Sequence, residues 1–269
     1  MTENYERYLK LLGIRRGEPS IAELAQVVHA HMTRIPFENI SKLYYLRTIG
    51  LREIPGLTQF LDGLEYYNFG GTCYANNFHI HQLLRFLGYN VELCGADMNQ
   101  QDAHLINLVR IEGREFIADV GYGAPFLKPL PRDLSTDYKI SLGSDQYILS
   151  PMDAAKRSQL TRFRDGIPRH GYLANPTPRD IKEFNHVIAD SFRPEAIFMN
   201  SLLLVRFSTD YSQVLHNMTF IESRGKSVRR KTYQTIDELI AAIEEIFAIP
   251  SAISHVALEG LSMRQDDWN

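Results

Sequence analysis

The sequence has little cysteine, no excess of positive charge and no long apolar run. Cys73 and Cys94 are the only cysteines among 269 residues, too few for a disulfide framework and typical of a reducing compartment. The 29 Lys and Arg residues against 32 Asp and Glu give a formal net charge of −3, which indicates no polyanionic partner. Because no apolar signal core or membrane-spanning stretch is evident, we expect a cytoplasmic protein with no nucleic-acid and no membrane partner.

Internal repeats, low-complexity segments and the G-x-G-x-x-G and Walker signatures of nucleotide-binding proteins are also missing. What is present is ordinary for a soluble globular protein, with 44% hydrophobic and 23% charged residues. The length allows two or three subdomains.

Helical and strand-like patterns occupy different parts of the chain. Residues 1–89 show helical periodicity, with a capping box from Ser20 to Glu23. From Tyr89 to about residue 175, short apolar segments separated by turn residues are typical of strands. A Pro-containing stretch, 174–180, then leads to a helix near 181–189, and the remaining residues mix both patterns. This order predicts an α+β fold.

Cys73 stands directly before an amphipathic helix in the segment NFGGTCYANNFHIHQLLRFLGY, residues 68–89. The free N–H groups and the dipole of a helix N-terminus favour a thiolate, and Gly70 and Gly71 allow a tight backbone there. Position 73 shares a helix face with Asn77 and the following leucines, so we expect its sulfur to point inward. That orientation fits a reactive thiol in a cleft, and it equally fits a core cysteine, the role that we assign to Cys94.

His79 and His81 lie on the same helix but point away from Cys73. Side chains two residues apart on a helix diverge, and no Cys or Asp cluster accompanies them, so we do not expect a metal pair. We interpret both as surface or partly buried polar residues.

His104 and Asp119 fall at the open end of a predicted hairpin. If Glu112 and Gly113 form a two-residue turn, the register places Asp119 diagonal to His104 on the same sheet face. A three-residue turn would place them on opposite faces. The pair fits a polar cap at a strand end, and together with Cys73 it also fits a nucleophile, a base and an orienting acid.

Several segments together resemble the arylamine N-acetyltransferase family over most of the chain. RIPFENIS (34–41) is similar to the helix-end motif of the family, and GGTCYANN (70–77) is similar to its Gly-Gly-x-Cys active-site signature. AHLINLV (103–109) and ADVGYG (118–123) resemble the segments that carry its histidine and aspartate. SFRPEAIF (191–198) and TIDELIAAIEEIFAIP (235–250) resemble its third domain.

The resemblance implies three segments around a cysteine-protease-like catalytic core: an N-terminal helical bundle (1–89), a central β-barrel with a connecting helix (90–190) and a C-terminal α/β lid (191–269). It implies a catalytic triad of Cys73, His104 and Asp119. This triad would move an acetyl group from the co-substrate acetyl-CoA to an arylamine or hydrazine through an acetyl-cysteine, without a metal.

Phe37 and Tyr122 match family aromatic positions beside the acceptor pocket, and Phe198 matches one nearer the CoA side. Core packing is an equally good interpretation of all three. The basic cluster 224–231 is interpreted as a solvated hairpin face rather than a phosphate site.

Two positions depart from the family pattern. Phe69 stands where the family usually has an arginine, and Ala75 stands where it usually has an acid. Glu38 would then need another cation, and Arg34 is the nearest candidate. These departures bear on the acyl and acceptor specificity and leave the triad untouched.

Three alternatives share these residues. An amide synthase of the same superfamily would pass a larger acyl group. A thiol hydrolase of the cysteine-protease or transglutaminase type would use water or a peptide without CoA. A binding protein would keep the fold with an unreactive thiol.

Overall fold

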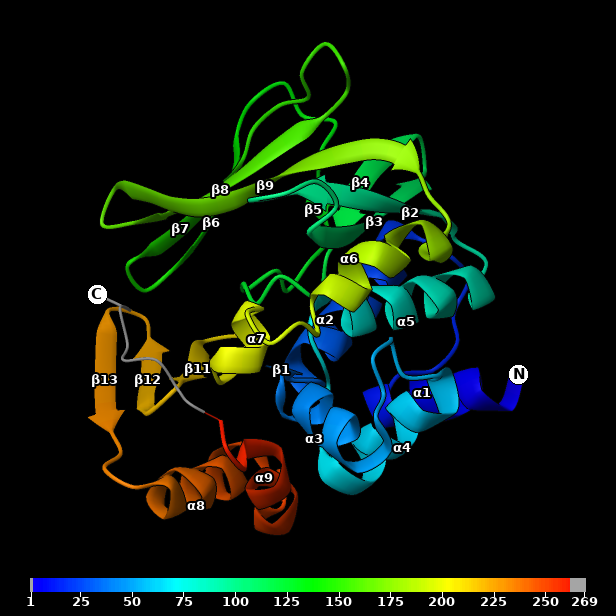
Figure 1. The fold of residues 1–269 in the computed structure, drawn as a ribbon. Helices are drawn as coiled ribbons and strands as arrows, with labels where there is room; N and C mark the ends of the chain where they lie inside the picture. Colours follow the sequence, from blue (N-terminus) through cyan, green and yellow to red (C-terminus); the bar gives the residue numbers. More distant parts are fainter. Residues whose placement is uncertain (1, 262–269) are drawn as a thin grey trace.

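The computed structural model describes residues 2–261, and its mixture of helices and sheets confirms the predicted α+β class (Figure 1). The N-terminal part contains α1 (Thr2–Leu12), α2 (Ile21–Arg34), α3 (Ile40–Ile49), α4 (Leu57–Tyr67) and α5 (Cys73–Phe86). The predicted cap at Ser20 is present, since its hydroxyl accepts a hydrogen bond from the Glu23 N–H at 3.1 Å. No helix within residues 2–261 has both the length and the apolar character needed to cross a bilayer.

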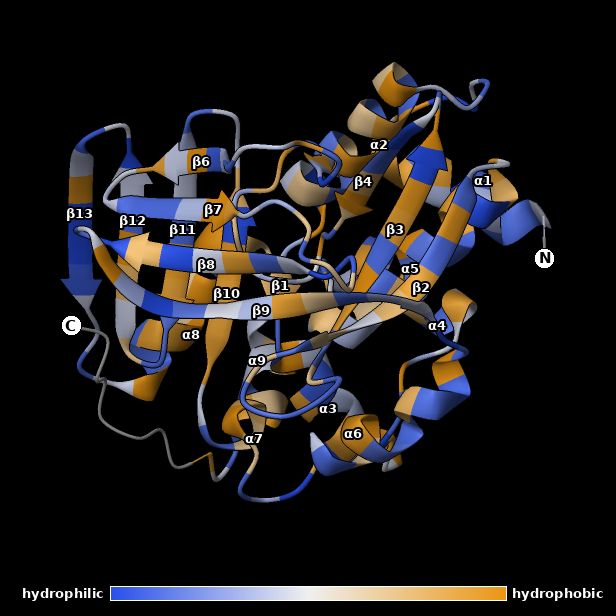
Figure 2. Ribbon diagram, turned by 90° about the horizontal axis from the view of Figure 1, so that it is seen from above, coloured by the Kyte–Doolittle hydropathy of each residue, from blue (hydrophilic) through white to orange (hydrophobic). Residues whose placement is uncertain are grey.

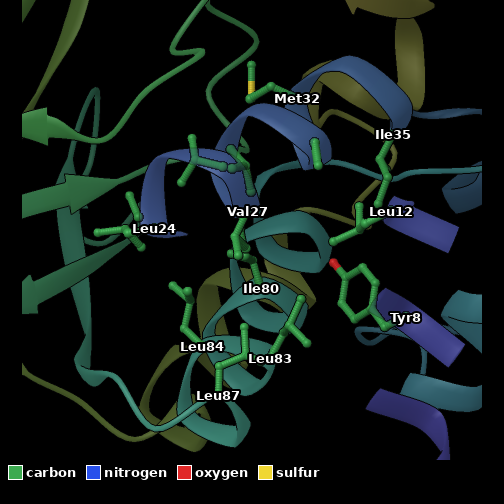
Figure 3. Close-up of a cluster of buried hydrophobic side chains, with 14 of the residues drawn as sticks. Tyr8, Leu12, Leu24, Val27, Met32, Ile35, Ile80, Leu83, Leu84 and Leu87 are labelled. Atoms are coloured by element: carbon green, nitrogen blue, oxygen red, sulfur yellow. The ribbon is translucent and has the colours of Figure 1, made fainter. Parts of the chain in front are cut away.

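The apolar faces of α1, α2 and α5 pack against one another to form the core of the helical bundle (Figure 3). On α5, Ile80, Leu83 and Leu84 are fully buried and recur at the spacing of one helix face. Full burial of each such side chain contributes about 1.5–3 kcal/mol relative to its exposure. This face fixes the position of α5 and therefore the position of its first residue, Cys73.

An eight-stranded antiparallel sheet curls into a nearly closed barrel, with α5 packed against β2 and β3. The strand order is β5-β4-β3-β2-β9-β8-β7-β6. The strands are β2 (Asn90–Asp97), β3 (His104–Ile111), β4 (Arg114–Ala118), β5 (Leu130–Pro131), β6 (Tyr138–Leu142), β7 (Asp145–Leu149), β8 (Ser158–Arg164) and β9 (Ile167–Pro178).

The β3–β4 hairpin has the predicted two-residue turn. Glu112 and Gly113 have φ angles of 52° and 73°, and a type I′ turn requires positive values at both positions. Asn107 pairs with Ala118, which confirms the predicted register. The ladder ends at Ala118, so Asp119 follows the strand instead of lying within it.

The stretch 174–180, predicted to leave the sheet, partly continues it, and this expectation was wrong. β9 runs to Pro178 and pairs with both β2 and β8, and a register shift between Cys94 and Ala96 accommodates the proline-containing end. The following predicted helix is divided into a 3₁₀ turn (Ile181–Phe184) and α6 (Asn185–Asp190).

The C-terminal lid combines a five-stranded sheet with three helices in the described residues. It contains α7 (Ile197–Asn200), β10 (Leu203–Phe207), β11 (Tyr211–His216), β12 (Thr219–Arg224), β13 (Ser227–Thr232), α8 (Ile236–Phe247) and α9 (Ser251–Leu258). The edge strand β13 is exposed and largely hydrophilic (Figure 2), as expected of a solvated basic hairpin.

The N-terminal part also contributes to this lid. Strand β1 (Phe37–Glu38) pairs with β10, and α3 packs against α9. The boundaries at residues 89/90 and 190/191 stay predictions, and the end of the last predicted segment, 262–269, lies outside the described residues.

Candidate active site

Cys73 is the first residue of α5 and lines a cleft between the bundle, the barrel and the lid. Two glycines shape the backbone before it. A Cβ atom on Gly70 would overlap the Pro36 carbonyl, and Gly71 has a φ angle of 126°, which L side chains rarely adopt. The sequence therefore holds the thiol at a helix N-terminus through a turn that only glycine fits. The Cys73 side chain is partly exposed, unlike that of Cys94, which is buried in the barrel core as predicted.

The structure brings the three predicted catalytic side chains together. His104 Nε2 lies 2.9 Å from Asp119 Oδ2, and the Cys73 sulfur hydrogen-bonds to the same imidazole. His104 and Asp119 are almost fully buried, with 2% and 1% of their surface exposed. Because Nε2 faces the carboxylate, Nδ1 is the ring nitrogen left for the thiol. The imidazole thus bridges sulfur and carboxylate.

Opposite charges on Cys73, His104 and Asp119 stabilise one another. Burial on its own would lower the pKa of His104, but the Asp119 carboxylate and the Cys73 thiolate together raise it to about 10. Burial likewise opposes ionisation of Asp119, yet His104 and the hydrogen-bond donors around the carboxylate hold its pKa below the usual value. At neutral pH the imidazole is therefore protonated beside an ionised aspartate.

Asn77 connects the helix that carries the thiol to the segment that carries the acid. Its Nδ2 donates to Asp119 Oδ1 at 2.8 Å, and its Oδ1 accepts from the Val120 N–H at 2.9 Å. The Gly121 N–H donates to the same aspartate oxygen at 3.0 Å. Sequence reasoning matched Asn77 to a family position and missed this bracing role. The signal was its place one turn after Cys73 on the same helix face.

Gly121 approaches the start of α5 so closely that no larger residue fits. A Cβ atom there would lie 2.8 Å from Cys73 Cα and 2.9 Å from the Cys73 carbonyl oxygen. We expect Gly121→Ala to push the thiol away from His104 and to lower kcat/KM for acyl transfer by roughly 100-fold, because small misplacements of reacting groups are costly. Gly56→Ala is the control, since no atom lies within 4 Å of the added methyl group. Unchanged kcat/KM in a folded Gly121→Ala protein would contradict this reading of the contact.

Glu38 has no cationic partner among residues 2–261, and the expectation that Arg34 would serve was wrong. Its buried carboxylate accepts hydrogen bonds from the N–H groups of Ser41 (2.8 Å) and Gly70 (3.0 Å). Arg34 instead has its guanidinium group beside Gly13 and lines a different cavity, together with Leu12 and Lys128. Glu38 therefore fixes the glycine turn before Cys73 through hydrogen bonds, one of them from the Gly70 N–H.

His79 and His81 are buried, so their assignment to the surface was wrong. The His79 ring stacks on Phe60 at 4.2 Å and its Nε2 contacts the Pro55 carbonyl, while His81 Nδ1 contacts Asn107 Oδ1 at 3.0 Å. Burial lowers the pKa of each to about 4, so both rings are neutral at pH 7. Partners in the bundle for His79 and in the barrel for His81 make burial of these rings possible.

Phe37, Tyr122 and Phe198 all line the cleft that contains Cys73 and His104. The cavity volume is about 690 Å³. The Phe37 and Phe198 rings lie 5.7 Å apart, and the Tyr122 ring lies 5.5 Å from His104. Aromatic side chains next to polar groups in one cleft suit an aromatic ligand that carries a polar substituent.

Basic side chains on β8 and β9 also reach this cleft, and sequence reasoning missed them. Arg162, Arg169 and His170 line its wall, and Arg162 pairs with Asp145 at 2.7 Å. No motif signals them, because only the curvature of the barrel brings this hairpin over the thiol.

Comparison with known proteins is consistent with this site. The family model described as N-acetyltransferase matches residues 20–256. The chain is 35% identical to an arylamine N-acetyltransferase / N-hydroxyarylamine O-acetyltransferase of Salmonella typhimurium, over 87% of the chain and 84% of that protein. It is 30% identical to Proansamycin X synthase of Amycolatopsis mediterranei over 46% of the chain and 51% of that protein.

Coverage differs among these relatives. The chain spans between about half and two thirds of the length of several curated relatives. The fold is similar throughout to that of the arylamine N-acetyltransferase from Mycobacterium abscessus, with a TM-score of 0.81 over 98% of both chains at 19% identity. The family model matches most of the chain, and the Salmonella typhimurium relative is 35% identical over 84% of its own length. The protein therefore belongs to the N-acetyltransferase family, a family of acyltransferases.

Proposed function

We propose that this protein transfers an acetyl group from acetyl-CoA to an aromatic amine or hydrazine, with Cys73 as nucleophile, His104 as acid and base, and Asp119 as orienting acid. The observation that carries the proposal is the imidazole of His104, which contacts both the thiol and the carboxylate. The similarity to the Salmonella enzyme, named for arylamine and N-hydroxyarylamine acetylation, supports the acceptor class.

The first half-reaction begins with a thiolate and an imidazolium. The Cys73 thiolate attacks the thioester carbonyl of acetyl-CoA, and the carbon–sulfur bond to CoA then breaks. The proton on His104 passes to the departing sulfur, so CoA leaves as a thiol. Backbone N–H groups near Cys73 would donate to the oxyanion that forms on the carbonyl.

The second half-reaction restores the enzyme. Acetylation removes the thiolate that helps to raise the pKa of His104, so the neutral imidazole is now able to act as a base. The amine attacks the acetyl-cysteine, His104 takes its proton, and the bond to Cys73 breaks. Phe37 and Tyr122 would hold the aromatic acceptor, and Phe198 would contact the side of the cleft nearer to CoA.

The test is direct observation of the intermediate. Incubation with acetyl-CoA, followed by peptide mass spectrometry, should find one acetyl group on the Cys73 peptide and none on the Cys94 peptide. A chase with a panel of arylamines and hydrazines should remove the acetyl group and yield N-acetyl products. An unmodified Cys73 peptide with excess acetyl-CoA would refute acetyl transfer.

A second candidate is an amide synthase that passes a larger acyl group. The similarity to Proansamycin X synthase and the cleft of about 690 Å³ favour it. It predicts that bulky acyl thioesters label Cys73 while acetyl-CoA does not. Rapid hydrolysis of esters without any CoA would instead indicate the thiol hydrolase alternative.

A further inference from the structure

Lys42, on α3, points its side chain toward the turn that precedes Cys73. The partly buried lysine lines a small cavity of about 40 Å³ that is distinct from the substrate cleft. Gly70, Gly71 and Thr72 line the same cavity. A cation therefore lies beside the backbone that presents the nucleophile.

The immediate contacts of the Lys42 amine are uncharged. Its Nζ donates to Ser191 Oγ at 2.6 Å and lies 3.8 Å from the centre of the Phe192 ring. Within the described chain, 2–261, no carboxylate forms an ion pair with it, although Glu53 lines the same cavity. Burial lowers the pKa of Lys42 to about 8. A partly desolvated ammonium without an acid needs another counter-charge.

Cys73 is positioned to supply that counter-charge. Gly71, Thr72 and Tyr74, on both sides of Cys73, line the cavity that Lys42 lines, and the Cys73 side chain packs against the apolar cluster that contains Phe192. Burial opposes the charged form of Lys42, and the negative sulfur is the group that raises its pKa in return. No other titratable group near Lys42 and Cys73 forms an ion pair with Lys42 in the described chain. These groups are His104 and Asp119 on the barrel side, Tyr74 on α5 with Asp102 and Asp190 nearby, Tyr45 on α3, and Glu53.

The side chains that flank the thiol cannot replace this charge. Phe69 packs against Tyr45 and Tyr67, and Ala75 lies beside Gly71. Both positions are neutral, and Glu38 is saturated by backbone donors. Lys42, on α3, is thus the cation that the helical bundle contributes near the Cys73 thiolate.

We propose that Lys42 is a positioning residue whose ammonium group stabilises the Cys73 thiolate in addition to His104. The thiolate then has two cationic neighbours, and acetylation of the sulfur removes the counter-charge of both. This inference rests on the proposed role of Cys73 as the nucleophile. It acts through Cys73 alone and requires no contact between Lys42 and substrate.

The experiment measures the rate of Cys73 alkylation by iodoacetamide between pH 5 and 10, followed by mass spectrometry of the Cys73 peptide. Lys42→Met removes the charge, Lys42→Gln removes it but keeps a donor for Ser191, and Lys42→Arg keeps the charge. Ser191→Ala removes the hydrogen bond from the amine together with the bond that Ser191 Oγ donates to the Ile188 carbonyl, and it leaves the charge of Lys42 in place. Thermal unfolding confirms that each protein is folded.

We expect the neutral variants to shift the alkylation midpoint upward by about one pH unit, so that the rate at pH 6 falls roughly tenfold. Lys42→Arg should retain the profile of the unaltered protein, and Ser191→Ala should shift it less than Lys42→Gln does. Superimposable profiles of Lys42→Met, Lys42→Gln and the unaltered protein would overturn the proposal, as would equal shifts in Lys42→Arg and Lys42→Met.

The assay needs no acetyl donor, so it tests the reactivity of Cys73 separately from the role of Lys42. A Cys73 that reacts no faster than an ordinary thiol in the unaltered protein would count against the proposed function itself. A reactive Cys73 whose alkylation profile does not change with the charge at position 42 would count only against the proposed role of Lys42.

Discussion

Cys73→Ala should abolish acyl transfer and leave the fold intact. The side chain is partly exposed at the cleft, so its loss removes little packing. The loss of the nucleophile leaves only binding and backbone donors, and nucleophile replacements of this kind cost about 10⁴- to 10⁶-fold in kcat. Acetyl-CoA turnover with an arylamine acceptor measures the activity, and thermal unfolding measures the fold.

The matched control is the other cysteine. Cys94→Ala removes a buried sulfur from the barrel core, where burial raises the thiol pKa to about 12. We expect it to lower the free energy of unfolding by about 1–2 kcal/mol, as for other small core truncations, and to keep acyl transfer. Full turnover by Cys73→Ala, or loss of turnover only in Cys94→Ala, would remove Cys73 from the mechanism.

The sequence could predict the triad because its geometry follows from short-range rules. Helix periodicity sets the direction of the Cys73 side chain, and the two-residue turn at Glu112 and Gly113 sets the face of His104. Asp119 needed one correction, since it lies just after the strand. There its carboxylate accepts from the Gly121 N–H and from Asn77, and this local arrangement is as rigid as a ladder position.

Contacts between distant segments could not be predicted in the same way. Two residues of β1 give no periodicity, and they become a strand only because β10 lies beside them. Lys42 gave no signal because a single lysine on a helix is usually solvated, and its neighbours Ser191 and Phe192 are about 150 residues away along the chain. His81 was misplaced for the same reason, since its partner Asn107 belongs to the barrel.

The pH dependence of stability should also report on the His104–Asp119 pair. The raised pKa of His104 contributes stability that is fully present below about pH 6.5 and is lost as the pH rises through about 10. The lowered pKa of Asp119 contributes stability that is present above about pH 4 and is lost as the pH falls below that value. In this pair the full contribution therefore lies between about pH 4 and 6.5.

Asp119→Asn should lower kcat by about 10³- to 10⁴-fold, because it reverses the hydrogen bonding of His104. The amide oxygen is held by the Asn77 side chain and the Gly121 N–H, so the amide NH₂ must face His104 Nε2. Nε2 then accepts, the proton moves to Nδ1, and the ring is no longer able to take the proton of Cys73. The lost carboxylate also lowers the pKa of His104.

Two readouts distinguish this effect of Asp119→Asn from simple damage to the fold. Alkylation of Cys73 should require a pH near the ordinary thiol pKa of about 8.5, and stability should lose its alkaline decline. Asp133→Asn is the control, since it breaks a surface ion pair with Arg114 far from the thiol and should leave the alkylation curve and the alkaline arm of the stability curve unchanged. Because acetylation and deacetylation both need the same imidazole, the acetyl-cysteine should form slowly and, once formed, also persist. An Asp119→Asn protein that forms and discharges the acetyl group at normal rates would show that Asp119 only packs against His104.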